Sequence, residues 1–176
     1  MAGQQFIIFG GVPSAGKTAL ARAVARELRA VYLDKDTIKD ETLRLARELK
    51  IETAVQLAGA LSLTLLMPLA RDNLTLGRTV ILDTPAGNKA VLDGVEDLVR
   101  DLKVDLKLIE CITTDENSLR PRADDRAEGG GEQRVRDGEA AQQARARLER
   151  LSGPRLVVDT AELVATNLPR VLKFLE

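Results

Sequence analysis

The sequence predicts an α/β protein built around a parallel β-sheet. Short apolar runs alternate along the chain with longer segments of helical periodicity, the pattern of repeated strand–helix–strand units. A chain of 176 residues is long enough to bury a core of its own. We find no linker or internal repeat that divides the chain, so we expect residues 1–176 to form a single domain.

The expected strands are short and apolar, and each is followed by a helix. We place the strands at Gln5–Phe9, Ala30–Leu33, Thr79–Leu82, Leu106–Ile112 and Arg155–Val158. The expected helices are rich in helix-forming residues and cover Lys17–Arg29, Thr37–Lys50, Glu52–Leu76, Lys89–Leu102, Gly138–Leu151 and Ala161–Leu175.

The segment Gly11–Thr18 reads GVPSAGKT and matches the phosphate-binding pattern G-x-x-x-x-G-K-[ST]. It follows the first strand and opens the first helix, where backbone N–H groups and the helix dipole can hold phosphate oxygens. Lys17 is expected to reach the outer phosphates and Thr18 to hold Mg²⁺. The alternative is a chance glycine-rich turn. The residues expected to bind the nucleotide are Gly11, Ser14, Ala15, Gly16, Lys17, Thr18 and Ala19.

Composition restricts the chemistry further. The 26 basic and 27 acidic residues are balanced, which gives no electrostatic argument for binding nucleic acid or membranes in bulk. The chain has no histidine, so a general base must be a carboxylate and a metal is expected to be a hard ion held by oxygen. Cys111 is the single cysteine, which rules out an internal disulfide. The N-terminal segment lacks the pattern of a signal peptide, and we expect a cytoplasmic protein.

Three aspartates follow expected strands. Asp83 closes the run VILD at the edge of the sheet where ligands of open α/β sheets bind, which predicts a carboxylate associated with Mg²⁺; the alternative is a turn former. Asp34 and Asp36 follow the second strand, and one could lie near the metal while the other accepts the proton of an acceptor hydroxyl. The alternative for Asp36 is that it only caps the following helix.

The segment from Thr113 to Asp137 has little periodicity and many charges, with arginine as its only basic residue type. We expect it to be a lid that brings arginines onto the transferring phosphoryl group. The alternative is a solvated charged loop.

The segment Leu61–Ala70 is apolar on nearly all sides. It is too short to span a bilayer, so core packing is the favoured interpretation, and a pocket wall or subunit interface is the alternative. Pro68 is expected to kink the helix and release the carbonyl of Thr64. A homodimer through the helix of residues 52–77 is therefore a hypothesis.

The opening GVPSAGKTALARAVARELRAVYLDKDTIKDE, together with VILDTPAG and RLVVDTAEL, resembles the small P-loop kinases of the group that includes zeta toxins, chloramphenicol phosphotransferase and polynucleotide kinase. This resemblance implies a three-layer P-loop NTPase fold with five parallel strands in the order 2-3-1-4-5 and an arginine-bearing lid. It also implies ATP- and Mg²⁺-dependent phosphoryl transfer to a hydroxyl of a small molecule, a metabolite or an antibiotic. The alternatives are an ATP-binding switch, a drug-binding resistance protein without transfer, and a polynucleotide 5′-hydroxyl kinase.

The resemblance also implies roles for single residues. Lys17 and Thr18 would contact ATP and Mg²⁺, and Asp36 would be the base for the acceptor. Lys39 stands where the group commonly has an arginine, and Asp83-Thr84 resembles the Asp-Thr pair of polynucleotide kinases. The spacing of Arg122 and Arg126 resembles that of the lid arginines. The full set of expected site residues is Lys17, Asp36, Arg122 and Arg126 for catalysis, Thr18, Asp34 and Asp83 for metal, and Asp36, Lys39 and Thr84 for substrate.

Overall fold

The computed structural model describes residues 3–11, 16–84, 89–114, 146 and 148–176. Its centre is a five-stranded, all-parallel sheet in the order β2-β3-β1-β4-β5. The predicted strand order is thus confirmed, and all five expected strands are present within one or two residues of their predicted ends. The strands are β1 (Gln5–Gly11), β2 (Val31–Asp34), β3 (Val80–Asp83), β4 (Asp105–Ile112) and β5 (Arg155–Asp159).

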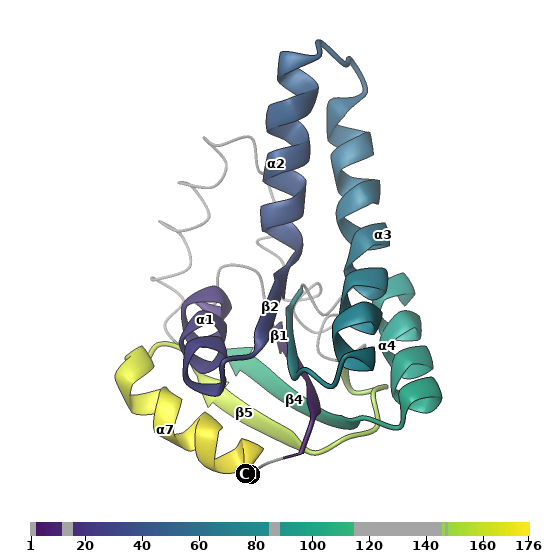
Figure 1. The fold of residues 1–176 in the computed structure, drawn as a ribbon. Coiled ribbons are helices and arrows are strands. Elements are labelled where there is room, and N and C mark those ends of the chain that lie inside the picture. Colours follow the sequence, from purple (N-terminus) through teal and green to yellow (C-terminus); the bar gives the residue numbers. More distant parts are fainter. Residues whose placement is uncertain (1–2, 12–15, 85–88, 115–145, 147) are drawn as a thin grey trace.

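Helices cover both faces of the sheet (Figure 1). On one face lie α1 (Lys17–Leu28) and α7 (Val164–Leu175), and on the other lie α3 (Ala54–Thr75) and α4 (Lys89–Leu102). One more described helix, α2 (Lys35–Glu48), follows β2 directly. The predicted three-layer α/β fold is therefore correct. Most of the helix predicted at Gly138–Leu151 lies outside the described residues, so this prediction stays open.

The core consists of two apolar clusters, one on each side of the sheet. Phe6 and Ile8 of β1 pack toward α3 and α4, whereas Ile7 and Phe9 pack toward α1 and α7. These four side chains are at most 1% exposed. A strand covered on both faces must be apolar at every position, which is why β1 reads as a continuous apolar run instead of an alternating one.

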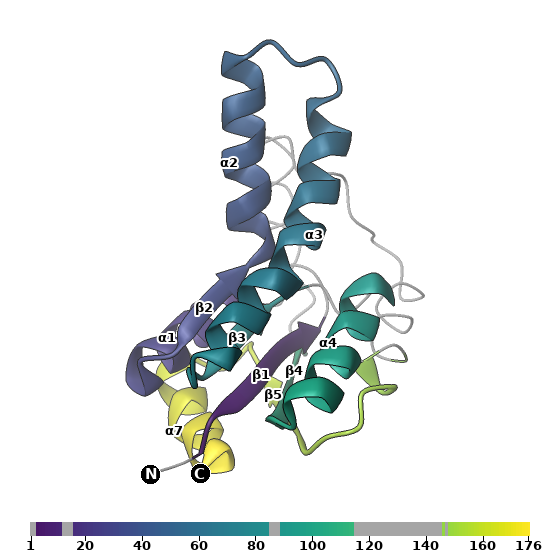
Figure 2. The ribbon, with the colours of Figure 1, turned by 45° about the vertical axis from the view of Figure 1, so that its right-hand side comes forward.

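The helices α2 and α3 form a hairpin that projects away from the sheet (Figure 2). One stripe of α3 is buried and contains Ala58, Leu66 and Ala70 among others, while Leu65 and Leu69 are exposed. The expected core packing of Leu61–Ala70 is thus correct for one stripe of the helix and wrong for the exposed side. The helix continues through Pro68 without interruption.

Among the described helices, α3 alone has the length and apolar composition of a membrane-crossing helix, with a mean hydropathy of 1.4 over its best window. Length and composition by themselves are weak grounds for a membrane span. The segment Leu61–Ala70, which by itself is too short to span a bilayer, lies within this helix of 22 residues.

Candidate active site

The phosphate loop stands between the end of β1 and the start of α1. Gly16 is the N-cap of α1 and has a left-handed backbone (φ 77°), and no side chain of the described residues caps this helix end. The first N–H groups of a helix need an acceptor, and a phosphate is a suitable one. The predicted residues Ser14 and Ala15 lie outside the described residues, and Ala19 is exposed in the first turn of α1.

At Gly11 the structure shows why a glycine is required. Its φ is +138°, and a Cβ atom added there would lie 2.0 Å from the carbonyl oxygen of Cys111. Strands β1 and β4 are paired at this point, Gly11 with Cys111, so neither backbone can move aside easily.

Thr18 and Asp83 meet at the carboxyl edge of the sheet. The Thr18 hydroxyl donates a hydrogen bond of 2.8 Å to Oδ2 of Asp83. The ammonium of Lys17 lies 3.5 Å from the carbonyl oxygen of Gly11. Lys17 is 9% exposed and Asp83 5% exposed. A cation, a hydroxyl and a carboxylate are thus held together at the end of the phosphate loop.

This arrangement fits Mg²⁺. Thr18 and Asp83 supply hard oxygen atoms, and Mg²⁺ in phosphate-loop proteins takes one or two protein oxygens together with water and the phosphates of the substrate. Within the described part of the chain, no group of three or more acidic, cysteine or histidine residues could hold a metal ion. The metal site that the sequence predicts therefore depends on few protein ligands.

Asp34 is the last residue of β2 and the register partner of Asp83, and Asp36 lies two residues further along the chain. Asp34 caps α2: its carboxylate accepts hydrogen bonds from the amide of Asp36 (3.0 Å) and the hydroxyl of Thr37 (3.0 Å). The alternative in which Asp36 caps this helix is wrong, because α2 begins two residues earlier than predicted. Asp36 instead lies exposed in the first turn of α2.

Burial raises the pKa of Asp34, and the neighbouring carboxylate of Asp83 raises it further. The guanidinium of Arg22 lies 3.6 Å from Oδ2 of Asp34 and compensates part of that repulsion. Asp34 therefore has three partners already, from Arg22, the Asp36 amide and the Thr37 hydroxyl.

Tyr32 is a site residue that sequence reasoning missed. Its hydroxyl donates a hydrogen bond of 2.9 Å to Oδ2 of Asp83. Burial raises the pKa of Tyr32 above its ordinary value, as do the carboxylates of Asp83 and Asp34, so the phenol stays protonated. The spacing in the sequence could have indicated this role, because Tyr32 is two residues before Asp34 and so faces the same side of the strand.

Two further predicted site residues lie nearby, and Cys111 does not take part. Lys39 is partly exposed and lies one turn after Asp36 in α2. Thr84 is 1% exposed, and within the described part of the chain its hydroxyl has no hydrogen-bond partner. Cys111 is buried in the core, and burial raises the pKa of its thiol to about 12. Arg122 and Arg126 lie outside the described residues.

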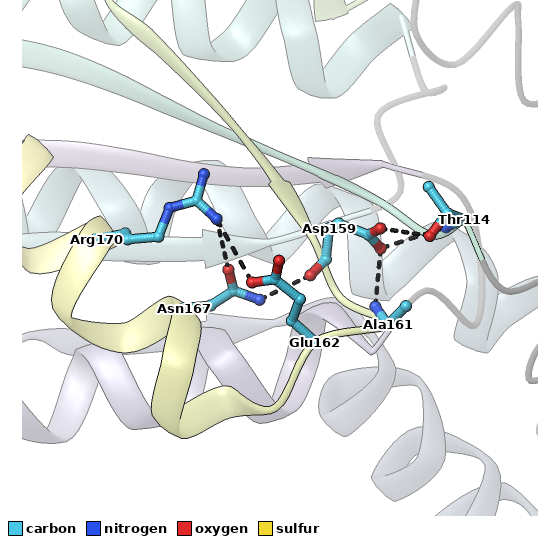
Figure 3. A network of polar contacts seen from close by, with 6 residues as sticks. All are labelled: Thr114, Asp159, Ala161, Glu162, Asn167 and Arg170. Carbon is cyan, nitrogen blue, oxygen red and sulfur yellow. Dashed lines mark hydrogen bonds and ion pairs between the residues drawn. The ribbon is translucent and has the colours of Figure 1, made fainter.

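A separate polar network fixes the carboxyl ends of β4 and β5 (Figure 3). The Asp159 carboxylate accepts hydrogen bonds from the Thr114 hydroxyl (2.5 Å) and the Ala161 amide (2.9 Å), which hold its pKa below the ordinary range. Asn167 of α7 donates to the Asp159 carbonyl (2.7 Å), and Arg170 contacts Asn167 and Glu162. Asp159 therefore fixes the turn into α7, as Asp34 fixes the turn into α2.

The fold and this site define a P-loop protein of the kinase type. A family model described as an AAA domain (AAA_33) matches residues 6–151. The chain belongs to this family, and the resemblance to small P-loop kinases is confirmed. No curated protein matches the chain.

Solved structures with the same fold cover nearly the whole chain. A candidate kinase from Chloroflexus aurantiacus J-10-fl is 24% identical with a TM-score of 0.73, and the match covers 99% of this chain and 97% of that one. The APS kinase of Mycobacterium tuberculosis, solved with AMPPNP and APS, is 18% identical with a TM-score of 0.60 and coverages of 99% and 98%. A gluconokinase from Sinorhizobium meliloti 1021 is 16% identical with a TM-score of 0.56 and coverages of 99% and 91%. At these identities the likeness shows the fold alone.

Proposed function

We propose that the protein is an ATP- and Mg²⁺-dependent phosphotransferase that acts on a hydroxyl of a small molecule, either a metabolite or an antibiotic. The main support for this proposal is the hydrogen bond between Thr18 and Asp83 beside the buried Lys17. The carboxylate of Asp36 adds a second element, because it lies in the first turn of the helix that begins at this same edge. A nucleotide-binding switch needs the first element and has no use for the second.

Each residue has a proposed task. Lys17 neutralises charge on the outer phosphates, and the oxygens of Thr18 and Asp83 hold Mg²⁺, with Asp34 as the predicted third member of that set. When bound, Mg²⁺ would offset negative charge on the transferring phosphoryl group. Asp36 accepts the proton of the acceptor hydroxyl, a task that falls to a carboxylate because the chain has no histidine.

The partners of Asp34 support the assignment of the base to Asp36. Asp34 accepts hydrogen bonds from the first turn of α2 and forms an ion pair with Arg22. These contacts fix the backbone that carries Asp36. Asp36 is exposed and can meet a substrate. Asp34 would thus position the first turn of α2 in addition to its proposed contact with Mg²⁺, and Asp36 would accept the proton.

The acceptor is proposed to approach α2, where Lys39 can contact it. The buried hydroxyl of Thr84, which has no hydrogen-bond partner among the described residues, is a second proposed contact. Balanced charge and few aromatic residues disfavour a polynucleotide acceptor. The lid at residues 113–137, with Arg122 and Arg126, stays a prediction that falls almost wholly outside the described residues. The single domain over residues 1–176 also stays a prediction.

The cytoplasmic location and the homodimer also stay proposals. Exposed Leu65 and Leu69 lie on a part of α3, residues 54–70, that carries no charged side chain. A two-fold contact places each surface against its own copy, so a surface without charge avoids like-charge repulsion. We therefore propose a second copy of this chain as the partner of this face.

The test of the nucleotide site is the Lys17→Ala variant. The backbone of the phosphate loop should remain while the charge on the outer phosphates is lost, so the variant should fold and bind ATP·Mg²⁺ far more weakly. Calorimetry with ATP measures this, and circular dichroism checks the fold. Unchanged affinity in a folded variant would overturn the phosphate-loop assignment. If the wild-type chain binds ATP, a screen of hydroxyl metabolites and antibiotics for ADP release separates a kinase from a switch.

A further inference from the structure

Oδ2 of Asp83 accepts two hydrogen bonds from two different elements. One comes from the Thr18 hydroxyl of α1 (2.8 Å) and the other from the Tyr32 hydroxyl of β2 (2.9 Å). The second contact is not a by-product of strand pairing, because the register partner of Tyr32 is Ile81. The phenol has to extend along the sheet by two residues to reach Asp83, and only a long side chain can do so.

The ring of Tyr32 has a second contact, with the side chain of Arg22. The guanidinium carbon of Arg22 lies 5.5 Å from the ring centroid, within the range of a cation–π contact. The same guanidinium pairs with Asp34 at 3.6 Å. Arg22 therefore connects the cap of α2 with the ring that contacts Asp83.

We propose that Tyr32 is a positioning residue for the metal-associated carboxylate of Asp83. This inference rests on the proposed function. Asp83 is 5% exposed, so it has few solvent donors to orient its oxygens. Two protein donors on Oδ2 fix the plane of the carboxylate before a metal arrives. Outer hydrogen bonds of this kind orient a metal ligand and raise metal affinity.

The experiment compares Tyr32→Phe with the wild-type chain. Phenylalanine keeps the ring over Arg22 and removes the hydroxyl alone. Binding of ADP is measured by calorimetry over a series of Mg²⁺ concentrations and in EDTA. We expect the Mg²⁺ concentration that gives half of the full affinity to rise about tenfold or more, the usual range for losing an outer partner of a metal ligand. The affinity for ADP in EDTA should be the same in both proteins, whereas a general structural defect would lower it.

The outcomes separate this inference from the proposed function. If the wild-type chain binds ADP with no dependence on Mg²⁺, the proposed metal site fails and the role of Tyr32 fails with it. If the wild-type chain shows the dependence and Tyr32→Phe gives the same Mg²⁺ midpoint, only the role of Tyr32 is overturned.

A second measurement needs no substitution. Tyr32 is the single tyrosine and the chain has no tryptophan, so emission excited near the tyrosine absorption maximum reports on Tyr32. With ADP bound in EDTA, added Mg²⁺ should change this emission, because the metal draws on the carboxylate that the phenol contacts. Should Tyr32→Phe not fold, an emission unaffected by Mg²⁺ would by itself overturn the inference.

Discussion

At the carboxyl edge of the sheet, hydrogen bonds tie Thr18, Tyr32 and Asp83 together, whereas the hairpin of α2 and α3 exposes Leu65 and Leu69. In the first region Asp83 is buried and accepts hydrogen bonds from both α1 and β2. The second is built from two helices that project from the body (Figure 1). The difference shows which region is constrained by its chemistry. Phosphoryl transfer needs groups held in fixed positions and shielded from water, whereas a surface that binds an acceptor or a partner can remain exposed to solvent.

The largest expected effect comes from placing the same substitution in both regions. Gly11→Ala should cost at least about 3 kcal/mol, because the backbone angle is unsuited to alanine and the methyl group would overlap the Cys111 carbonyl. Gly59→Ala in α3 meets nothing within 4 Å and should stabilise the protein by about 0.5–1 kcal/mol. Urea unfolding of both variants measures the contrast. Equal effects would show that the two regions are not packed differently.

The next effect concerns the junction of the two regions, the first turn of α2. Asp36→Asn should lower turnover by about two to four orders of magnitude, the usual range for the loss of a general base. ATP affinity and stability should hold, since Asp34 remains as the cap. Asp40, exposed one turn later in α2, is the control, and Asp40→Asn should leave turnover unchanged. Steady-state kinetics decides it once an acceptor is known. Normal turnover of Asp36→Asn would move the role to Asp34 or Asp83.

The last comparison distinguishes the two sides of α3. Leu66 is 0% exposed, and Leu66→Ala should cost about 2–5 kcal/mol. Leu65 is 41% exposed and Leu69 39% exposed. A double change of Leu65 and Leu69 to serine should alter stability by less than about 1 kcal/mol. It should also reduce the molar mass from dimer to monomer in light scattering. A wild-type chain that is monomeric at all concentrations would refute the homodimer.

The hairpin is also where sequence reasoning was weakest. The apolar run at Leu61–Ala70 indicated a helix buried on every side, yet only one stripe of α3 is buried. Composition tells how apolar a helix is. It does not tell how much of the sheet is available to cover the helix, and α3 extends beyond the sheet with α2. A periodicity argument cannot foresee that extension, because it depends on where two distant segments meet.

What the sequence determined alone was the local chemistry and the order of the elements. The glycines, Lys17 and Thr18 identify the phosphate loop because each phosphate contact requires a particular residue type at a fixed spacing. Apolar runs followed by helices define a parallel sheet, and the resemblance to P-loop kinases supplied its order. The structure also showed that α2 begins two residues earlier than predicted, which makes Asp34 its cap. Only the tertiary structure decided that Tyr32 contacts Asp83. That contact depends on the parallel register of β2 and β3, and register is a property of paired strands that no single segment encodes.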